Sequence, residues 1–169
     1  MENLLSKYNA CDVILVCGLP GTGKSVFSRQ YFKQSGRKRI NQAEIRHLLF
    51  EMTNFGDPWK EEFFHEEDEA LVNHVERKLY EHLLFSHQKV LVDNPGLTAA
   101  QRKVYIETAR KINKTIGAIF LDIEIQQCLL RNHNRPDPIP DSVITNLYAS
   151  MELPSDSEGF EIVHVVLVK

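Results

Sequence analysis

The chain has 169 residues, which suits one hydrophobic core and is short for two. Hydrophobic residues make up 43% and charged residues 25%, a balance that argues against a disordered chain and against one built to cross a membrane. The formal net charge of −3 means that the molecule as a whole does not attract polyanions, so contact with nucleic acid would need a local basic patch.

The start of the chain and its cysteines predict a cytoplasmic protein. Residues 1–7 lack the basic start and apolar stretch of a secretory signal, and the longest apolar runs are far below the roughly 20 residues that span a bilayer. The cysteines, Cys11, Cys17 and Cys128, are odd in number and form no C-x-x-C pair. Reduced, buried thiols fit better than a disulfide framework or a zinc site. We expect a cytoplasmic location and no membrane partner.

A glycine-rich loop follows the first predicted strand directly. The apolar run 13–17 predicts the strand, and residues 18–25 fit the pattern G-x-x-x-x-G-K-[ST]. Glycines let the backbone curl with its N–H groups pointing inward, so that amide dipoles and the start of the next helix converge on a phosphate. The residues that we expect to bind the phosphates of a nucleotide are Gly18, Leu19, Pro20, Gly21, Thr22, Gly23, Lys24, Ser25 and Val26.

Two side chains of this loop carry the expected chemistry. Lys24 can reach the β- and γ-phosphate oxygens of a nucleoside triphosphate. Ser25 offers a hydroxyl to Mg²⁺, which prefers oxygen ligands and bridges phosphates while keeping several waters. The predicted cofactors are therefore ATP or GTP, together with Mg²⁺.

Five cations follow within a short stretch, from Arg29 to Arg39. They are candidates for a local contact with nucleic acid. A solvated helix end, which also favours positive charge, explains them equally well.

Strands and helices alternate along the rest of the chain. We predict strands at residues 38–41, 89–93, 116–121 and 160–168, and helices at residues 24–34, 43–52, 61–87, 98–112, 124–132 and 141–151. The helix that follows Thr98 has this residue as its N-cap, with Gln101 completing a capping box. The stripe expected to be buried on the longest helix contains Phe64, Leu71, Val75 and Leu79. The alternation is typical of an α/β fold with a parallel sheet flanked by helices on both faces.

A carboxylate ends the strand predicted at residues 89–93. Asp93 follows three apolar residues, and ligands of open α/β sheets gather at the carboxyl ends of strands. There Asp93 is predicted to orient Mg²⁺ or its waters. The alternative is that Asp93 only begins the turn 93–96.

A polar, proline-rich segment near the end of the chain is a candidate lid. Residues 133–140 cannot form regular structure, and loops of this kind beside a phosphate site often close over it. Arg131 and Arg135 flank the segment and would share one face if the helix continued. A guanidinium that closes over the transferring phosphoryl group stabilises its charge. The plainer interpretation is two solvated arginines.

Several segments, taken in order, resemble the P-loop kinases of the polynucleotide 5′-hydroxyl kinase type, within the superfamily that includes zeta-toxin-like kinases. They are residues 18–25, 41–46, 90–98, 131–135, 139–144 and 158–160. The resemblance covers nearly the whole chain and implies a single P-loop kinase domain over residues 1–169, with a small lid at about 131–140. It also implies transfer of the γ-phosphoryl group of a nucleoside triphosphate to a hydroxyl, with the 5′-hydroxyl end of RNA or DNA as the first acceptor. A kinase of a small metabolite or nucleotide and a catalytically silent ATP-binding protein are the alternatives.

The chain departs from this family's pattern at the expected general base. The family carries an aspartate just after the second strand, which accepts the acceptor's proton, and an arginine two or three residues later, which holds the acceptor's phosphate. Arg46 matches the arginine, Ala43 stands in the aspartate's place, and Glu44 is its acidic neighbour. Either Glu44 or another carboxylate is the base, or the chain has lost transfer, or the aspartate was replaced so that substrate stays bound. The candidate catalytic residues implied by the resemblance are Lys24, Glu44, Arg46, Arg131 and Arg135.

Overall fold

The structure, a computed structural model, describes residues 5–136 and 138–168 of the chain. Within these residues one sheet is formed by β1 (Val13–Cys17), β2 (Lys38–Ile40), β3 (Val90–Asp93), β4 (Ile116–Asp122) and β5 (Ile162–Leu167). The strand order is β2-β3-β1-β4-β5, and every neighbouring pair runs parallel. The predicted parallel α/β sheet is confirmed.

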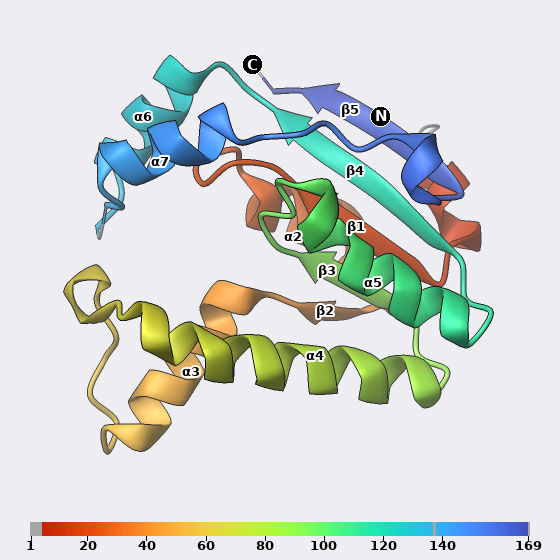
Figure 1. The fold of residues 1–169 in the computed structure, drawn as a ribbon, viewed down its shortest axis with the longest axis horizontal. Helices are drawn as coiled ribbons and strands as arrows, with labels where there is room; N and C mark the ends of the chain where they lie inside the picture. Colours follow the sequence, from red (N-terminus) through yellow and green to blue (C-terminus); the bar gives the residue numbers. More distant parts are fainter. Residues whose placement is uncertain (1–4, 137, 169) are drawn as a thin grey trace.

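Helices connect the strands (Figure 1). The α-helices are α2 (Lys24–Phe32), α3 (Gln42–Thr53), α4 (Glu69–Phe85), α5 (Ala99–Lys111), α6 (Ile125–His133) and α7 (Asp141–Ala149). Short 3₁₀ turns are η1 (Lys7–Ala10), η2 (Glu61–Phe63), η3 (Glu66–Asp68) and η4 (Asp156–Glu158). The predicted capping box of Thr98 and Gln101 starts α5.

The central strand β1 is buried along its whole length because helices cover both faces of the sheet. Its residues alternate between two cores. The core on one face contains Leu15 together with side chains of α4, α5 and α7. The core on the other face contains Ile14 together with side chains of η1 and α2. The prediction of helices on both faces is therefore confirmed.

The loops that follow β1, β3 and β4 leave the sheet at one edge, where the strand order reverses around β1. Figure 1 shows α6 and α7 on one side of this edge, and α3 with the 54–68 connection on the other. In the register between β1 and β3, Val16 lies opposite Asp93. The glycine-rich loop and Asp93 therefore emerge side by side.

The cysteines are buried and unpaired, as predicted. Burial raises the pKa of Cys17 to about 12, so its thiol stays protonated at neutral pH. In the part of the chain that the structure describes, none of the helices has both the length and the apolar surface needed to cross a bilayer.

The prediction of one long helix over residues 61–87 is wrong for its first eight residues. Residues 61–68 form the separate turns η2 and η3, and α4 begins at Glu69. Phe64 and His65, between the turns, have ψ angles of 120° and 131°. These extended conformations interrupt the helical path, although the residue pattern is helical on both sides.

The buried face of α4 also differs from the prediction. Its buried residues are Val72, Glu76, Tyr80 and Leu84. Leu71 and Leu79, which were expected in the buried stripe, are 51% and 38% exposed. Glu76 is buried because Asn94 and Tyr105 donate hydrogen bonds to its carboxylate. Hydrophobic spacing selected the wrong face because it counts a buried glutamate as solvent-facing.

Candidate active site

The glycine-rich loop passes so close to β4 and α6 that its glycines are required. Gly18, Gly21 and Gly23 have φ angles of 142°, 87° and 88°, which other residues rarely adopt. A β-carbon on Gly18 would lie 2.5 Å from the carbonyl oxygen of Leu121, and one on Gly21 would lie 3.1 Å from that of Cys128. The loop therefore has the curled backbone that phosphate binding needs.

Lys24 is held over this loop. Its Nζ donates to the carbonyl oxygens of Gly18 and Leu19, at 2.8 Å in each case. The buried hydroxyl of Thr22 also donates to Leu19, at 2.9 Å. Burial lowers the pKa of Lys24 to about 8, because surroundings of low polarity disfavour the charged ammonium. Lys24 therefore loses its proton at a lower pH than an exposed lysine does.

The remaining predicted loop residues are less enclosed. Pro20 and Ser25 are half-buried, and Val26 is 65% exposed. Ser25 and Val26 belong to the first turn of α2, whose N–H groups have no partner within the helix. Their contact with a nucleotide stays a prediction.

Asp93 has one carboxylate oxygen bound and one without a partner. Its Oδ2 accepts from Nε and Nη2 of Arg39, at 2.9 and 2.7 Å. Its Oδ1 is buried and has no hydrogen-bond partner in the described chain. An unpaired buried carboxylate oxygen is costly, so this atom suits a place beside a cation or the water bound to it. The residues present fit Mg²⁺, with Asp93 and Ser25 as its predicted holders.

Arg39 joins Asp93 to Glu44, a link that sequence reasoning missed. Its Nη1 donates to both carboxylate oxygens of Glu44, at 2.8 and 2.9 Å. Arg29 of α2 also donates to Glu44, at 3.2 Å. Guanidinium groups therefore engage both oxygens of Glu44, and a role as substitute base would require this carboxylate to be released. The sequence had marked Arg39 only as a member of the basic cluster from Arg29 to Arg39, near the end of a predicted strand.

The cations from Arg29 to Arg39 do not make one continuous basic surface. Arg29 and Arg39 pair with the same glutamate, as described above. Arg37 donates to three backbone carbonyls near the start of β1. The remaining two are exposed lysines. The structure therefore uses three of these five cations internally.

Hydrogen bonds tie the start of α3 to the end of β3. Asn41 caps α3 and donates through Nδ2 to the carbonyl oxygen of Asp93, at 2.7 Å. The N–H of Gln42 donates to Oδ1 of Asn94, at 2.8 Å. Ala43, the next residue, is exposed. The position at which the resemblance implies a general base is thus fixed close to the end of β3.

Arg46 is held by Glu69 at the start of α4. Its Nε and Nη2 donate to the two carboxylate oxygens, the second contact measuring 2.9 Å. Its guanidinium also lies 5.5 Å from the centre of the Phe64 ring. Bidentate arginine–carboxylate pairs are among the stronger polar contacts. An acceptor phosphate, predicted to bind Arg46, would have to compete with Glu69.

Arg131 and Arg135 come from different elements, because α6 ends at His133. Nη1 of Arg131 lies 3.4 Å from the carbonyl oxygen of Gly21. The positive charge of Arg135 is one of the minor influences that lower the pKa of Lys24, after burial. Both arginines therefore lie near the phosphate loop, although not on one helix face.

The predicted lid is tied at its base by Asn132. This fully buried side chain donates to the carbonyl oxygen of Ile139 at 2.6 Å and accepts from its N–H at 3.0 Å. His133 lies 2.9 Å from the carboxylate of Asp141, the first residue of α7. Asp137, within the predicted lid range, lies outside the described residues. Closure of this segment over a substrate stays a prediction.

A family model described as an AAA domain (AAA_33) matches residues 13–154. Among curated proteins, the chain is 25% identical over 150 residues to the L-seryl-tRNA(Sec) kinase of Methanococcus maripaludis. That alignment covers 89% of this chain and 56% of the archaeal protein, so the chain spans about half the length of this relative.

The fold is shared with solved structures of low sequence identity. A gluconokinase from Sinorhizobium meliloti superposes with a TM-score of 0.61 at 19% identity, covering 92% of this chain and 82% of the other. A chain of the Pnkp1/Rnl/Hen1 RNA repair complex superposes with a TM-score of 0.60 at 18% identity, covering 82% and 43%. The matched range holds the glycine-rich loop, Asp93 and both lid arginines, and the chain therefore belongs to the AAA_33 family of P-loop kinase domains.

Proposed function

We propose that this protein transfers the γ-phosphoryl group of ATP or GTP to a hydroxyl group with the help of Mg²⁺. The observation that carries the proposal is the meeting of the curled glycine loop, Lys24 and the unpaired oxygen of Asp93 at one edge of the sheet. Phosphoryl transfer depends mainly on positioning and on compensating negative charge, and these groups are suited to both tasks.

Each residue near the loop has a role in this proposal. Lys24 and the loop N–H groups bind the β- and γ-phosphates, while Ser25 and Asp93 orient the metal. Arg131 and Arg135 place positive charge near the transferred phosphoryl group, where they stabilise the transition state. Mg²⁺ held by Ser25 and Asp93 would offset negative charge on the phosphates.

The acceptor that we propose first is the 5′-hydroxyl end of RNA or DNA. The resemblance described above implies that Arg46 binds an acceptor phosphate, and the curated relative is named for an RNA-linked substrate. The pairing of Arg46 with Glu69 and the net charge of −3 favour a second candidate, a small-molecule hydroxyl. The similarity in fold to a gluconokinase is compatible with it.

The proposal is tested with γ-labelled ATP, Mg²⁺ and a panel of acceptors. The panel holds RNA and DNA oligonucleotides with 5′-hydroxyl ends, free nucleosides, sugars and simple alcohols. Label should appear on one acceptor class and should be absent with Lys24→Met. ATP binding without transfer to any hydroxyl would instead indicate a silent nucleotide-binding protein.

Replacing Arg131 or Arg135 by alanine should lower kcat by about a hundredfold or more in a form that transfers phosphate, because a guanidinium acts mainly on charge that develops in the transition state. The dissociation constant for ATP should change much less. Single-turnover kinetics and calorimetry separate the two effects, with the exposed Lys103→Ala as the matched control on α5. A loss confined to KM would assign these arginines to ordinary substrate binding.

The preference for phosphate-bearing acceptors should depend on Arg46 and be restrained by Glu69. We expect Arg46→Ala to erase the preference for a 5′-hydroxyl nucleoside 3′-phosphate over the free nucleoside. Glu69→Gln should strengthen it by about tenfold, because a neutral amide competes less with phosphate for the guanidinium. The measurement is kcat/KM for the two acceptors. If the unchanged chain, Arg46→Ala and Glu69→Gln all showed the same preference for the phosphate-bearing acceptor, Arg46 would not bind the acceptor phosphate.

A further inference from the structure

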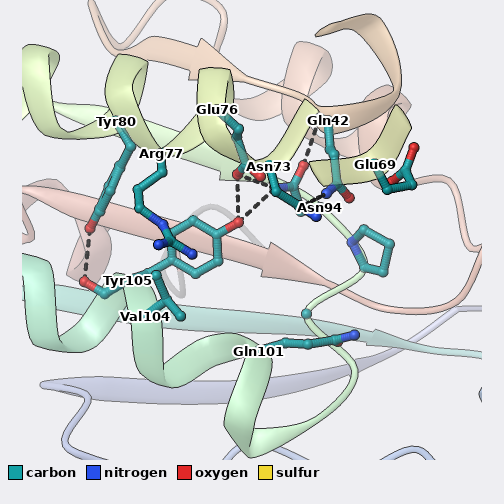
Figure 2. A pocket seen from close by; sticks show the side chains of 12 residues that line it. Gln42, Glu69, Asn73, Glu76, Arg77, Tyr80, Asn94, Gln101, Val104 and Tyr105 are labelled. Carbon is teal, nitrogen blue, oxygen red and sulfur yellow. Dashed lines mark hydrogen bonds between the residues drawn. The ribbon is translucent and has the colours of Figure 1, made fainter. Parts of the chain in front are cut away.

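A pocket of about 430 Å³ lies between α4 and α5, beside the end of β3 (Figure 2). Its volume is within the range of roughly 300–1,000 Å³ found for small-molecule sites. The wall of the pocket contacts the phosphate loop at one point, since the carbonyl oxygen of Pro95 accepts a hydrogen bond from the N–H of Gly18 at 2.9 Å. The pocket therefore adjoins the segment that carries the proposed phosphoryl-donor site.

The wall from α4 contributes a buried carboxylate with one oxygen to spare. Glu76 is 4% exposed, and its Oε1 accepts from Nδ2 of Asn94 and from the hydroxyl of Tyr105. Asn94 also donates to that hydroxyl, at 2.9 Å, which fixes all three groups. No hydrogen bond to Oε2 is found in the described residues, and Oε2 is not one of the unpartnered atoms that are buried from solvent. It is therefore accessible, and Glu76 lines the pocket. It can accept a hydrogen bond from a ligand.

Other lining residues add donors and an apolar surface. Gln101 accepts through Oε1 from the N–H of Leu97 at 2.8 Å, so its amide N–H groups are the part available to a ligand. Arg77, Val104 and Tyr105 also line the pocket (Figure 2). The pocket thus offers an acceptor, several donors and an aromatic ring within one small volume.

The charges around the pocket leave no surplus for an anion. The charge of Glu69 is matched by Arg46, with which it forms a bidentate pair. Arg77 also lines the pocket, and its positive charge partly offsets that of Glu76. Phosphate sites normally hold an excess of positive charge or of N–H dipoles, and this lining has neither. Hydroxyl groups both donate and accept, so they match a lining that mixes carboxylate and amide groups.

We propose that this pocket binds the uncharged, polyhydroxylated part of the acceptor, such as a sugar ring, with Glu76 accepting a hydrogen bond from one of its hydroxyls. This inference rests on the proposed kinase function and narrows its acceptor. The C–H face of such a ring would pack on Tyr105 and Val104. Its polar groups would meet Glu76 and Gln101.

The test compares binding of uncharged compounds with that of their phosphorylated counterparts. The probes are D-ribose and myo-inositol, compared with ribose 5-phosphate and myo-inositol 1-phosphate. Binding of each probe to the full chain is measured by ligand-observed NMR. Val104→Trp should fill the pocket mouth from α5. Leu79→Trp, on the outer side of α4 and away from the lining, is the matched control. Glu76→Gln keeps one carbonyl oxygen for Asn94 and Tyr105 and replaces Oε2 by an N–H donor.

We expect at least one uncharged probe to bind, and its phosphorylated counterpart to bind at least tenfold more weakly. Val104→Trp and Glu76→Gln should each weaken the uncharged probe by about tenfold or more, whereas Leu79→Trp should not. Tighter binding of the phosphorylated probes, or no uncharged probe sensitive to Val104→Trp, would overturn the inference. ATP titration of the same samples keeps the two proposals apart. Loss of ATP binding counts against the kinase, and retained ATP binding without probe binding counts against the pocket alone.

Discussion

Ala43→Asp is expected to raise the rate of phosphoryl transfer by about 10²–10⁴-fold, the usual contribution of a positioned general base. Ala43 is exposed in the first turn of α3, so a carboxylate fits there without displacing the core. Acidic side chains are also favoured near a helix N-terminus. The melting temperature and the affinity for ATP should therefore stay nearly unchanged. Initial rates with labelled ATP and the best acceptor of the panel measure the effect.

Ala43→Asn is the matched control, because asparagine has the same shape but does not accept a proton at neutral pH. It should leave the rate near that of the unchanged chain. If the unchanged chain is already fast and aspartate adds nothing, another carboxylate such as Glu44 serves as the base. If neither form transfers phosphate to any hydroxyl, the silent nucleotide-binding alternative should replace the kinase proposal.

Affinity for ATP is expected to fall as the pH rises through about 8, because the pKa of Lys24 lies near that value. A triphosphate favours the charged ammonium, so its binding raises the pKa of Lys24. Below pH 8 the free protein already carries this proton. Above it the proton must be taken up on binding, and the dissociation constant should rise by up to tenfold per pH unit. Calorimetry at saturating Mg²⁺ between pH 7 and 9.5, in buffers of different ionisation enthalpy, measures both affinity and proton uptake.

Two variants isolate Lys24 in this profile. Lys24→Met should weaken ATP binding by about a hundredfold and flatten the profile, because it removes charge-assisted contacts worth about 1.5–3 kcal/mol each. Lys24→Arg should flatten it too, since arginine stays charged throughout. A slope that persists in both variants would place the titrating group elsewhere. Unchanged affinity in Lys24→Met would show that the loop does not bind the triphosphate.

The sequence alone was sufficient for the sheet, most helices and the phosphate loop. These features depend on local rules: an apolar run before glycines that need positive φ angles, and a capping box at Thr98. Hydrophobic spacing gave the wrong prediction for residues 61–68 and for the buried face of α4. There the outcome depends on distant partners, since Glu76 can be buried only when Asn94 and Tyr105 are brought to it.

The candidate site divides in the same way. Residue spacing determined the loop from Gly18 to Ser25, and the strand pattern placed Asp93 at the correct edge. Only the tertiary structure decided which charges pair there, namely Arg39 with Asp93 and Arg46 with Glu69. These pairs join residues far apart in the chain, and the choice of partner depends on how β2, β3 and α4 pack together. The sequence therefore determined where the glycine-rich loop lies, while the fold decided which charged side chains surround it.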